Sequence, residues 1–383
     1  MDKPTVQDIF HRFYPAYLDQ YSPSPVQAKV AHNIMNCKTG AYGANVCVCE
    51  DCGFVQIHYN SFRNRCCPMC QAVPKEMWMD ARREDVLDAP YFHLVFTVPD
   101  ILNPVIYSNQ RLLYDALYHA ASSTISELTA DPKHLGTKVG YICILHTWGS
   151  EMNFHPHIHT ILLGGGLASN NQWKDNGENF FLPIRVISKV FRGKYLEELK
   201  RLWEEDKLVF HGTAEKFRNH YTFKELLDSC YGMDWIPHCK KTFNGAQTVM
   251  KYLSKYTHRI AVSNHRIVRM DDDTVTFLVK DYRNEGQWKE LTISGVEFVR
   301  RFLMHVPPRR FVRIRHYGLL CFRTKNQKLT LCRNLLGCKK YLSKLRDMEM
   351  PEILEHLYGI KVCACKACGG HLGKPQMRMP LRC

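Results

Sequence analysis

The stretch HPHIHT, residues 155–160, decides the fold, because three of its six residues are histidines at alternate positions. Successive side chains of a β-strand point to opposite faces, so His155, His157 and His159 would line one face of an extended segment. A strand that only packs into a core would carry aliphatic side chains or threonine there. A row of imidazoles indicates a metal site, and the alternatives are chance histidines or a structural zinc site.

The composition indicates a globular protein with a polyanionic partner. The chain has 383 residues, which allows two or three domains, and 45% of them are hydrophobic, which is enough for sizeable cores. Lysine and arginine outnumber aspartate and glutamate by 52 to 37, for a net charge of +15. Nucleic acid is the commonest partner of so basic a chain.

Targeting signals are missing from the sequence, which predicts a cytoplasmic protein associated with the nucleoid. No run of about 18 apolar residues is present, so no membrane partner is expected. The start, MDKPTVQDIFHRF, lacks the apolar segment of a signal peptide. Thiols stay reduced in the cytosol, so the 17 cysteines indicate metal binding rather than disulfides.

Hydrophobic periodicity predicts an α+β fold, because helices and strands are mixed without regular alternation. Two short helices are predicted within 5–36, separated at the SPSP around Ser22 to Pro25. Further helices are predicted at 74–88, 104–129, 193–206, 213–229, 244–256 and 296–304. Strands are predicted at 91–98, 138–147, 154–163, 235–242, 259–263, 266–270, 274–280 and 288–293.

Two short cysteine pairs indicate a zinc ribbon or finger. Cys49 and Cys52 form the first pair and Cys67 and Cys70 the second, with 14 residues between the pairs. We expect these four thiolates to hold one structural Zn²⁺, and the ion to hold the fold of a module that has little core of its own. Buried free thiols are the alternative.

Neighbours of these pairs leave the ligand set open. Cys66 or His58 could replace one ligand, and the roles of Cys37 and Cys47 are ambiguous. Two arginines between the pairs suggest that the module also contacts phosphate. They are Arg63 and Arg65.

A second zinc site is predicted near the C-terminus, where CACKACGG contains Cys363, Cys365 and Cys368. Its fourth ligand is open, and loose thiols without metal are the alternative. The candidates for that ligand are His371, Cys383 and Cys338.

Two tyrosines occupy one face of the helix predicted at 244–256. Tyr252 and Tyr256 are four residues apart in VMKYLSKYTHRI and would stack one turn apart. Two phenols packed in a core are the plain interpretation of this pattern. Their occurrence together with a histidine strand and a basic chain favours a chemical role.

These motifs together resemble the two-tyrosine HUH transposases of the IS91 insertion-sequence family, which move as single-stranded DNA. HUH denotes histidine, a bulky hydrophobe and histidine, here His157-Ile158-His159. The matching stretches span nearly the whole chain in family order. They are YNSFRNRCCPMC, YFHLVFTVP, HTWGSEMNFHPHIHTILLGGG, YLSKYTHRIAVSN, VTFLVKDYRN and EFVRRFLMHVPPRRFVRIRHYG. Two departures occur, because Phe62 and Cys66 stand where the family usually has Cys and His.

The resemblance implies the roles of the site residues. His157 and His159 would bind a divalent ion, Mg²⁺ or Mn²⁺, and Tyr252 and Tyr256 would be the catalytic nucleophiles. The third ligand is open: His146 on the preceding strand is the candidate, and His155 and Glu151 are alternatives. Such a site would also take zinc in vitro.

The resemblance also implies a three-part organisation. Residues 1–88 would form a helical and zinc-binding module that recognises transposon ends. Residues 89–308 would form the catalytic domain around an antiparallel HUH-type sheet, similar to ferredoxin and RRM folds, with flanking helices. Residues 309–383 would form a basic DNA-binding region with the second zinc site.

The C-terminal part favours single-stranded DNA as partner. Between Arg300 and Arg346 there are 14 lysines or arginines and no aspartate or glutamate, and aromatic residues interleave with them. That pattern is typical of a phosphate track with stacking partners, although a solvated charged face is the usual explanation of charge runs. The DNA-binding residues predicted here are Arg309, Arg310, Arg313 and Arg315.

The expected activity is metal-dependent cutting and joining of single-stranded DNA through a 5′-phosphotyrosine. No G-x4-G-K-[ST] loop is present, so host helicases or replication factors are candidate partners. Three alternatives stay open: a relaxase or replication initiator, a non-enzymatic zinc-dependent DNA-binding protein derived from a transposase, and a zinc hydrolase. For a zinc hydrolase, the sequence lacks a general base placed as in the motif H-E-x-x-H.

Overall fold

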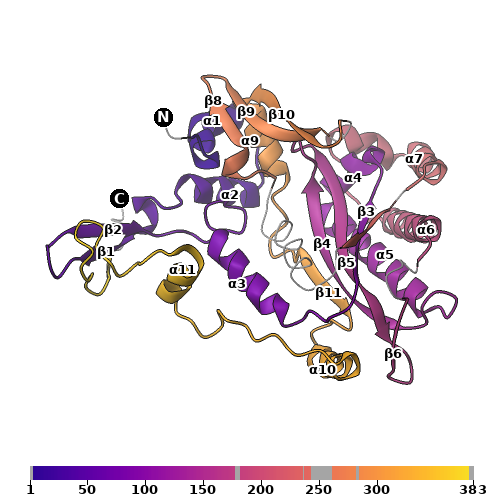
Figure 1. Ribbon diagram of the computed structural model, residues 1–383. Coiled ribbons are helices and arrows are strands. Elements are labelled where there is room, and N and C mark those ends of the chain that lie inside the picture. Colours follow the sequence, from indigo (N-terminus) through magenta and orange to yellow (C-terminus); the bar gives the residue numbers. More distant parts are fainter. Residues whose placement is uncertain (1–2, 177–181, 236, 243–260, 282–283, 379–383) are drawn as a thin grey trace.

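The computed structural model describes residues 3–176, 182–235, 237–242, 261–281 and 284–378 (Figure 1). Its mixed helices and antiparallel strands confirm the α+β class. The helices are α1 Val6–Gln20, α2 Pro25–Met35, α3 Ala72–Arg83, α4 Asn103–Ser108, α5 Gln110–Ala130, α6 Ile184–Glu204, α7 His220–Gly232, α9 Gly295–Met304, α10 Lys325–Leu336 and α11 Met350–Tyr358, with short 3-10 turns between some of them.

The described strands form three sheets. A small sheet has the order β12-β1-β2 and a second the order β10-β9-β8, while the central six-stranded sheet has the order β11-β4-β5-β3-β7 with β6 beside β5. Their bounds are β1 Ala44–Val48, β2 Val55–Tyr59, β3 Tyr91–Thr97, β4 Lys138–Trp148, β5 Phe154–Leu167, β6 Trp173–Asp175, β7 His238–Thr242, β8 Ile267–Met270, β9 Thr274–Asp281, β10 Gln287–Ser294, β11 Ile314–Gly318 and β12 Gln376–Arg378.

The central sheet is organised around the β4–β5 hairpin. Residues 149–153 connect the two strands, and His146 pairs with His157 across them. On the other side of β5, Val95 of β3 pairs with His159. Directly paired residues of antiparallel strands point to the same face. This register therefore brings the histidines of two strands to one face of the sheet.

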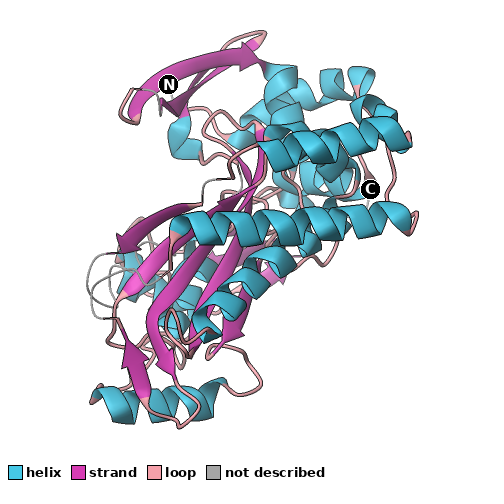
Figure 2. Cartoon of the chain, turned by 90° about the vertical axis from the view of Figure 1, so that its right-hand side faces the viewer, coloured by secondary structure: helices cyan, strands magenta, loops and turns pink. Residues whose placement is uncertain are grey.

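The two faces of the central sheet are covered differently. One face carries Phe92, Phe96 and Leu162, which belong to the main core beneath α5, α6 and α7. Long helices lie across the strands on this side (Figure 2). On the opposite face, Ile144 and Ile161 belong to a smaller core with residues of α3 and α10. The histidines extend this second face toward the hairpin turn.

The strand predicted at 154–163 is longer in the structure, because β5 continues beyond residue 163 to Leu167. The predicted end of this strand is therefore wrong. Its glycines permit close approach of neighbouring groups inside the sheet. A Cβ on Gly164 would lie 2.9 Å from the Pro90 carbonyl oxygen, and one on Gly166 would lie 2.5 Å from the Lys138 carbonyl oxygen. Glycine is therefore required at these positions because neighbouring backbone atoms leave no room for a Cβ atom, and not because the chain turns here.

The helix predicted at 104–129 is divided in the structure. Asn109 separates α4 from α5 and is buried. Its side chain donates to the carbonyl oxygens of Val105 and Val209 and accepts from the Val209 N–H. These bonds replace helical ones, because an amide side chain can satisfy backbone groups outside a helix. The helix predicted at 213–229 is likewise a 3-10 turn, Gly212–Arg218, followed by α7.

A second core joins the N-terminal helices to residues after 260. Phe10 of α1 packs edge to face on Phe302 of α9, with ring centroids 5.2 Å apart. Met152, at the tip of the β4–β5 turn, is fully buried in the same core. In addition, β11 pairs with β4, and β12 pairs with β1. Packing therefore crosses both expected boundaries, and the division at 88 and 308 stays a prediction.

Some predicted elements cannot be compared with the structure. The helix predicted at 244–256 lies outside the described residues. Of the strand predicted at 259–263, residues 261–263 are described and are not in a strand. None of the helices in the described part of the chain combines the length and hydrophobicity that a membrane crossing needs.

The hairpin turn is held against α9 by His305, which predicts a pH dependence of stability. His305 is buried, donates from Nε2 to the Met152 carbonyl oxygen over 3.0 Å, and lies 3.2 Å from Thr147 Oγ1. Burial lowers its pKa from 6.5 to about 4. His305 therefore becomes protonated at a higher pH in the unfolded chain than in the folded protein. Its contribution to the free energy of unfolding is fully present above pH 6.5 and is lost as the pH drops toward 4.

Exchanging His305 for a residue that does not titrate should weaken this acid sensitivity. A His305→Gln variant should be less stable at pH 7, but the stability gap to the parent should narrow by about 2 kcal/mol between pH 7 and pH 5. Urea unfolding at both pH values measures this. An exposed control, His211→Gln, should be as stable as the parent at pH 7. A gap that is constant or widens toward pH 5 would contradict the assignment.

Candidate functional site

Three histidines of the β4–β5 hairpin converge on one point. His146, His157 and His159 each offer a ring nitrogen, and these nitrogens all lie within 4.8 Å of one another. The residues are 4%, 8% and 8% exposed, respectively. The structure thus brings the third-ligand candidate, His146, to the two histidines of the HUH motif.

The hydrogen bonds of the rings aim their nitrogens at the centre of the group. His157 donates from Nδ1 to the carbonyl oxygen of His155 over 2.6 Å, which leaves its Nε2 as an acceptor. His159 Nδ1 lies 2.9 Å from His93 Nε2, and the two rings stack. The Nε2 atoms of His157 and His159 are 3.0 Å apart. A hydrogen bond on one ring nitrogen orients the other, as in histidines that bind metals.

Burial keeps these rings neutral. Desolvation, with a smaller contribution from His155, lowers the pKa of His157 to about 4. Desolvation also places the pKa of His159 well below its usual value, and the neighbouring histidines add to this effect. A neutral imidazole offers a lone pair, and lone pairs that face one another are stabilised by a cation between them. The donor set therefore fits a divalent metal ion.

The two alternatives for the third ligand lie outside this group. The ring of His155 turns to Asp100, with His155 Nδ1 3.2 Å from Asp100 Oδ1. Glu151 is exposed in the hairpin turn, and its carbonyl oxygen accepts a bond from Arg301. The predicted nucleophiles, Tyr252 and Tyr256, lie outside the described residues.

His93 was not identified from the sequence. It is the third residue of β3 and lies on the same face as Val95, the partner of His159. The strand YFHLVFTV offered a signal, since a histidine stands among apolar residues at an alternate position. Only the register of β3 against β5 shows that this ring reaches His159.

The cysteines form two groups that differ from the predicted one. Cys49 and Cys52 lie with Cys365 and Cys368, whereas Cys67 and Cys70 lie with Cys37. The prediction that Cys49, Cys52, Cys67 and Cys70 hold one ion is therefore wrong. The error arose because the partners of Cys49 and Cys52 are more than 300 residues away in sequence.

Several candidate zinc ligands lie outside both groups. Cys66 is buried near the charges of Arg313 and Arg65, and burial raises the pKa of its thiol to about 11. His58 pairs with Gln56. The other candidates that the two groups do not include are Cys47, Cys338, Cys363 and His371. Cys383 lies beyond the described residues.

The second group contains three thiols. Cys37 Sγ and Cys70 Sγ are 3.1 Å apart, too far for a disulfide. Hydrogen bonds from Cys67, from Cys37 and from Ser61 lower the pKa of Cys70 to about 5. The thiolate form of Cys70 is thereby favoured, as metal coordination requires.

The predicted DNA-binding arginines differ in their availability. Arg63, Arg65, Arg309 and Arg310 are exposed. Arg65 donates to the carbonyl oxygens of Phe311 and Pro308.

Arg315 is engaged within the protein. It forms an ion pair with Asp115 and lies 4.0 Å above the ring of Tyr118. Arg313 is desolvated by burial, which lowers its pKa. Both residues therefore have a structural environment that the sequence pattern did not indicate.

Carboxylates outside the basic run at 300–346 pair with several of its lysines and arginines. Glu297 holds Arg300 and Arg301. Asp85 binds Lys325, and Glu84 binds Arg346. The charge run is therefore no continuous free track, because partners far away in sequence fold against it.

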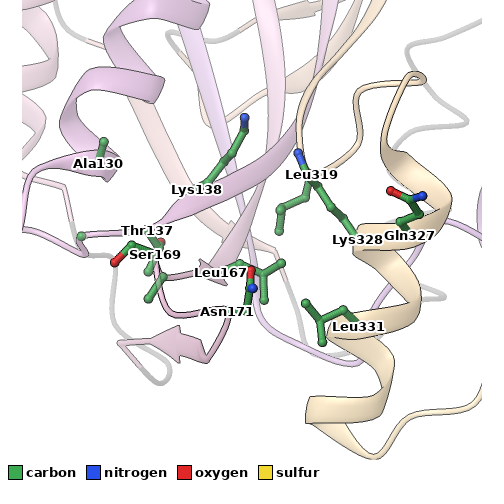
Figure 3. A pocket seen from close by; sticks show the side chains of 12 residues that line it. Ala130, Thr137, Lys138, Leu167, Ser169, Asn171, Leu319, Gln327, Lys328 and Leu331 are labelled. Carbon is green, nitrogen blue, oxygen red and sulfur yellow. The ribbon is translucent and has the colours of Figure 1, made fainter.

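A surface pocket lies away from the histidines. It has a volume of about 480 Å³, and Lys138, Lys328, Leu167 and Leu319 are among the residues that line it (Figure 3). Lys138 begins β4, roughly 27 Å along the strand from His146. Burial and the neighbouring Lys138 ammonium lower the pKa of Lys328. This pocket has no part in the histidine site.

Two family models match the chain. Residues 9–98 match the model described as a transposase zinc-binding domain, and residues 140–328 match the one described as a putative transposase. The first range contains the N-terminal cysteines, and the second contains the three histidines.

Among solved structures, the conjugative relaxase TrwC in complex with oriT DNA, in a copper-bound form, is 14% identical with a TM-score of 0.27. The likeness covers 69% of this chain and 92% of the relaxase chain.

Two relatives cover most of the chain. The putative transposase y4qJ of Sinorhizobium fredii is 39% identical over 369 residues, which are 95% of this chain and 93% of that protein. The transposase for insertion sequence element IS801 of Pseudomonas savastanoi pv. phaseolicola is 29% identical over 79% of this chain and 72% of that protein. With the matching family models, these relatives show that the chain belongs to the IS91 family of transposases.

Proposed function

We propose that this transposase cuts and rejoins single-stranded DNA through a 5′-phosphotyrosine link, beside a divalent ion held by His146, His157 and His159. The observation that carries the proposal is the convergence of three buried imidazoles on one point, two of which, those of His157 and His159, burial keeps neutral. A bound ion would polarise the scissile phosphate and offset the charge that develops on it. Phosphate and water oxygens would complete the coordination of Mg²⁺ or Mn²⁺.

The protein's own contribution is to hold the ligands in place. His93 orients His159, and the carbonyl oxygen of His155 orients His157. The paired strands fix both rings relative to His146. Because these ligands sit on strands rather than on a loop, they need little rearrangement when a phosphate binds.

The nucleophiles in this proposal are Tyr252 and Tyr256. A phenolate oxygen attacks phosphorus, the bond to the 3′ oxygen breaks, and that oxygen takes up a proton to leave a free 3′ hydroxyl. Rejoining reverses the step: a 3′ hydroxyl attacks the phosphotyrosine, and tyrosine leaves. The covalent link conserves the bond energy, so no ATP is needed. Two nucleophiles allow one strand to be held while another is cut.

The segment that carries the tyrosines follows a strand of the same sheet as the histidines. Strand β7, which ends at Thr242, pairs with β3, and Val95 of β3 is paired with His238 as well as with His159. Beyond this segment, Ala261 and Val262 are buried in the second core. Strand β7 thus ends on the central sheet two strands from β5, with Thr242 beside Tyr91, the partner of Leu163.

A basic pocket provides a surface for the DNA backbone. Lys29, Arg65 and Arg309 line a pocket of about 420 Å³ between α2, residues 64–66 and the segment after α9. Arg63 and Arg310, which are close in sequence to Arg65 and Arg309, are also exposed. Clustered lysine and arginine side chains neutralise phosphates and release counterions.

A zinc hydrolase is disfavoured by the composition of the site. Among the described residues, the histidine group includes no carboxylate that could act as a general base. The neutral imidazoles instead suit an ion whose remaining positions are filled by a phosphate.

Removal of both phenols should abolish covalent attachment. With a labelled single-stranded transposon-end oligonucleotide and Mg²⁺, the parent protein should form an adduct that survives denaturing electrophoresis. The Tyr252→Phe, Tyr256→Phe double variant should form none, because phenylalanine offers no oxygen to phosphorus. An adduct that persists in this variant would remove the tyrosines from the proposed mechanism.

Alanine substitutions of histidines in and beside this group should show which imidazoles bind the metal ion. His157→Ala should lose Mn²⁺ binding in calorimetry, and His93→Ala should weaken it by about 10- to 100-fold, since it removes the partner that orients a ligand. The matched control is His155→Ala on the same strand, whose ring faces Asp100. Equal Mn²⁺ affinity in the parent and His157→Ala would refute the metal assignment.

Loss of exposed arginines should weaken DNA binding without a change of sequence preference. An Arg309→Ala, Arg310→Ala variant should bind single-stranded DNA less tightly, and the slope of log K against log salt should become shallower by about 0.7 for each phosphate that is no longer neutralised. Fluorescence anisotropy over a salt series measures both. Arg218→Ala, an exposed arginine paired with Glu215, should behave like the parent. An unchanged slope in the double variant would exclude these arginines from the interface.

A further inference from the structure

Two pentapeptides from distant parts of the chain have the same pattern of cysteine and glycine. They are CEDCG at 49–53 and CKACG at 365–369. Each places two thiols three positions apart and follows the second with glycine. The family model for the zinc-binding domain ends at residue 98, so it contains only the first of them.

The backbone of the two pentapeptides is also alike. Gly53 has φ of 67° and Gly369 has φ of 77°, in the left-handed region that favours glycine. The N–H of Gly53 donates to the Cys49 carbonyl oxygen over 3.0 Å, and that of Gly369 donates to the Cys365 carbonyl oxygen over 2.9 Å. Each pentapeptide therefore forms the same tight turn with both thiols directed to one side.

The four sulfur atoms of these turns face one another. Cys49 Sγ lies 3.5 Å from Cys368 Sγ, and Cys52 Sγ lies 3.7 Å from Cys365 Sγ. All four lie within 4.8 Å of each other. A tetrahedral ion with sulfur ligands at about 2.3 Å separates them by roughly 3.8 Å, whereas a disulfide needs about 2.05 Å. The spacing fits a shared ion.

Backbone pairing places the C-terminal segment beside the strands of the N-terminal zinc-binding module. β12 pairs with β1, and the Glu50 N–H donates to the His371 carbonyl oxygen over 3.0 Å. The N–H of Gly373 donates to the Val48 carbonyl oxygen over 2.9 Å. Figure 1 shows the C-terminal segment beside β1 and β2, away from α6 and α7.

Apolar packing alone is too small to hold this arrangement. The buried hydrophobic cluster at this junction contains Cys47, Cys49, Cys365 and Leu372. Two of its members are the thiols in question. A cluster of this size offers little burial to offset the ordering of two chain segments, so a small module of this kind depends on its metal.

We propose that Cys49, Cys52, Cys365 and Cys368 form one tetrathiolate zinc site that joins the N-terminal module to the C-terminal segment. Four thiolates in a closed tetrahedral set are typical of structural zinc, and iron is the other metal that favours this geometry. The C-terminal residues therefore belong to the zinc-binding module, although they lie far beyond the matched range. The ion ties residues more than 300 positions apart, so the basic region at 300–346 is part of a closed loop.

Thiol alkylation tests this site in the unaltered protein. Cys52, Cys368, Cys363 and Cys321 are all exposed, but only Cys52 and Cys368 belong to the group. With metal bound, iodoacetamide should modify Cys363 and Cys321 rapidly and spare Cys52 and Cys368, as peptide mass spectrometry can show. A zinc chelator should make Cys49, Cys52, Cys365 and Cys368 reactive together. Alkylation of Cys52 and Cys368 as fast as Cys363 in metal-replete protein would overturn the proposal.

Metal analysis of variants provides a second test. The Cys365→Ser, Cys368→Ser variant should contain one zinc fewer per chain than the parent, whereas Cys363→Ser should contain the same amount. Loss of iron instead of zinc would overturn the choice of metal, and unchanged metal content would overturn the site. Neither test uses DNA or turnover. A failure of tyrosine adducts with intact thiol protection would therefore refute the proposed reaction and leave the zinc site standing.

Discussion

The pairing of His146 with His157 across the β4–β5 hairpin is the constraint on which the site depends. A shift of the register by one residue would turn the side chains of one strand to the opposite face, where Phe96 and Leu162 pack beneath helices. The turn prevents such a slip. Met152 at its tip is buried in the second core, and His305 bonds to its carbonyl oxygen. The second core thus fixes a register in the central sheet.

Local patterns predicted a substantial part of the fold. Hydrophobic periodicity identified strands β3, β4 and β5, and His157, His159 and His146 were recognised as candidate metal ligands. The two short helices predicted within 5–36 correspond to α1 and α2, which are separated at the SPSP segment. These features depend on residues within a few positions of one another, which a single sequence displays directly.

Features that depend on distant partners could not be predicted in this way. The thiols of Cys49 and Cys52 face residues 365 and 368, although Cys67 and Cys70 are much nearer in sequence. The basic run after Arg300 contains no carboxylate, yet Asp85 and Glu84 fold against it. His93 reaches His159 only because β3 lies next to β5 in the central sheet. In each case the missing information was which segments meet in space.

These interactions give a consistent picture of an IS91-family transposase whose central sheet carries a group of buried histidines on one face. Burial keeps the imidazoles of His157 and His159 neutral, and neutral imidazoles can share one cation. The most direct measurement is an anomalous difference map from Mn²⁺-soaked crystals that contain single-stranded DNA. We predict one peak coordinated by the nitrogens of His146, His157 and His159 and by a phosphate oxygen. A manganese peak elsewhere, with those rings uncoordinated, would contradict the proposed metal site.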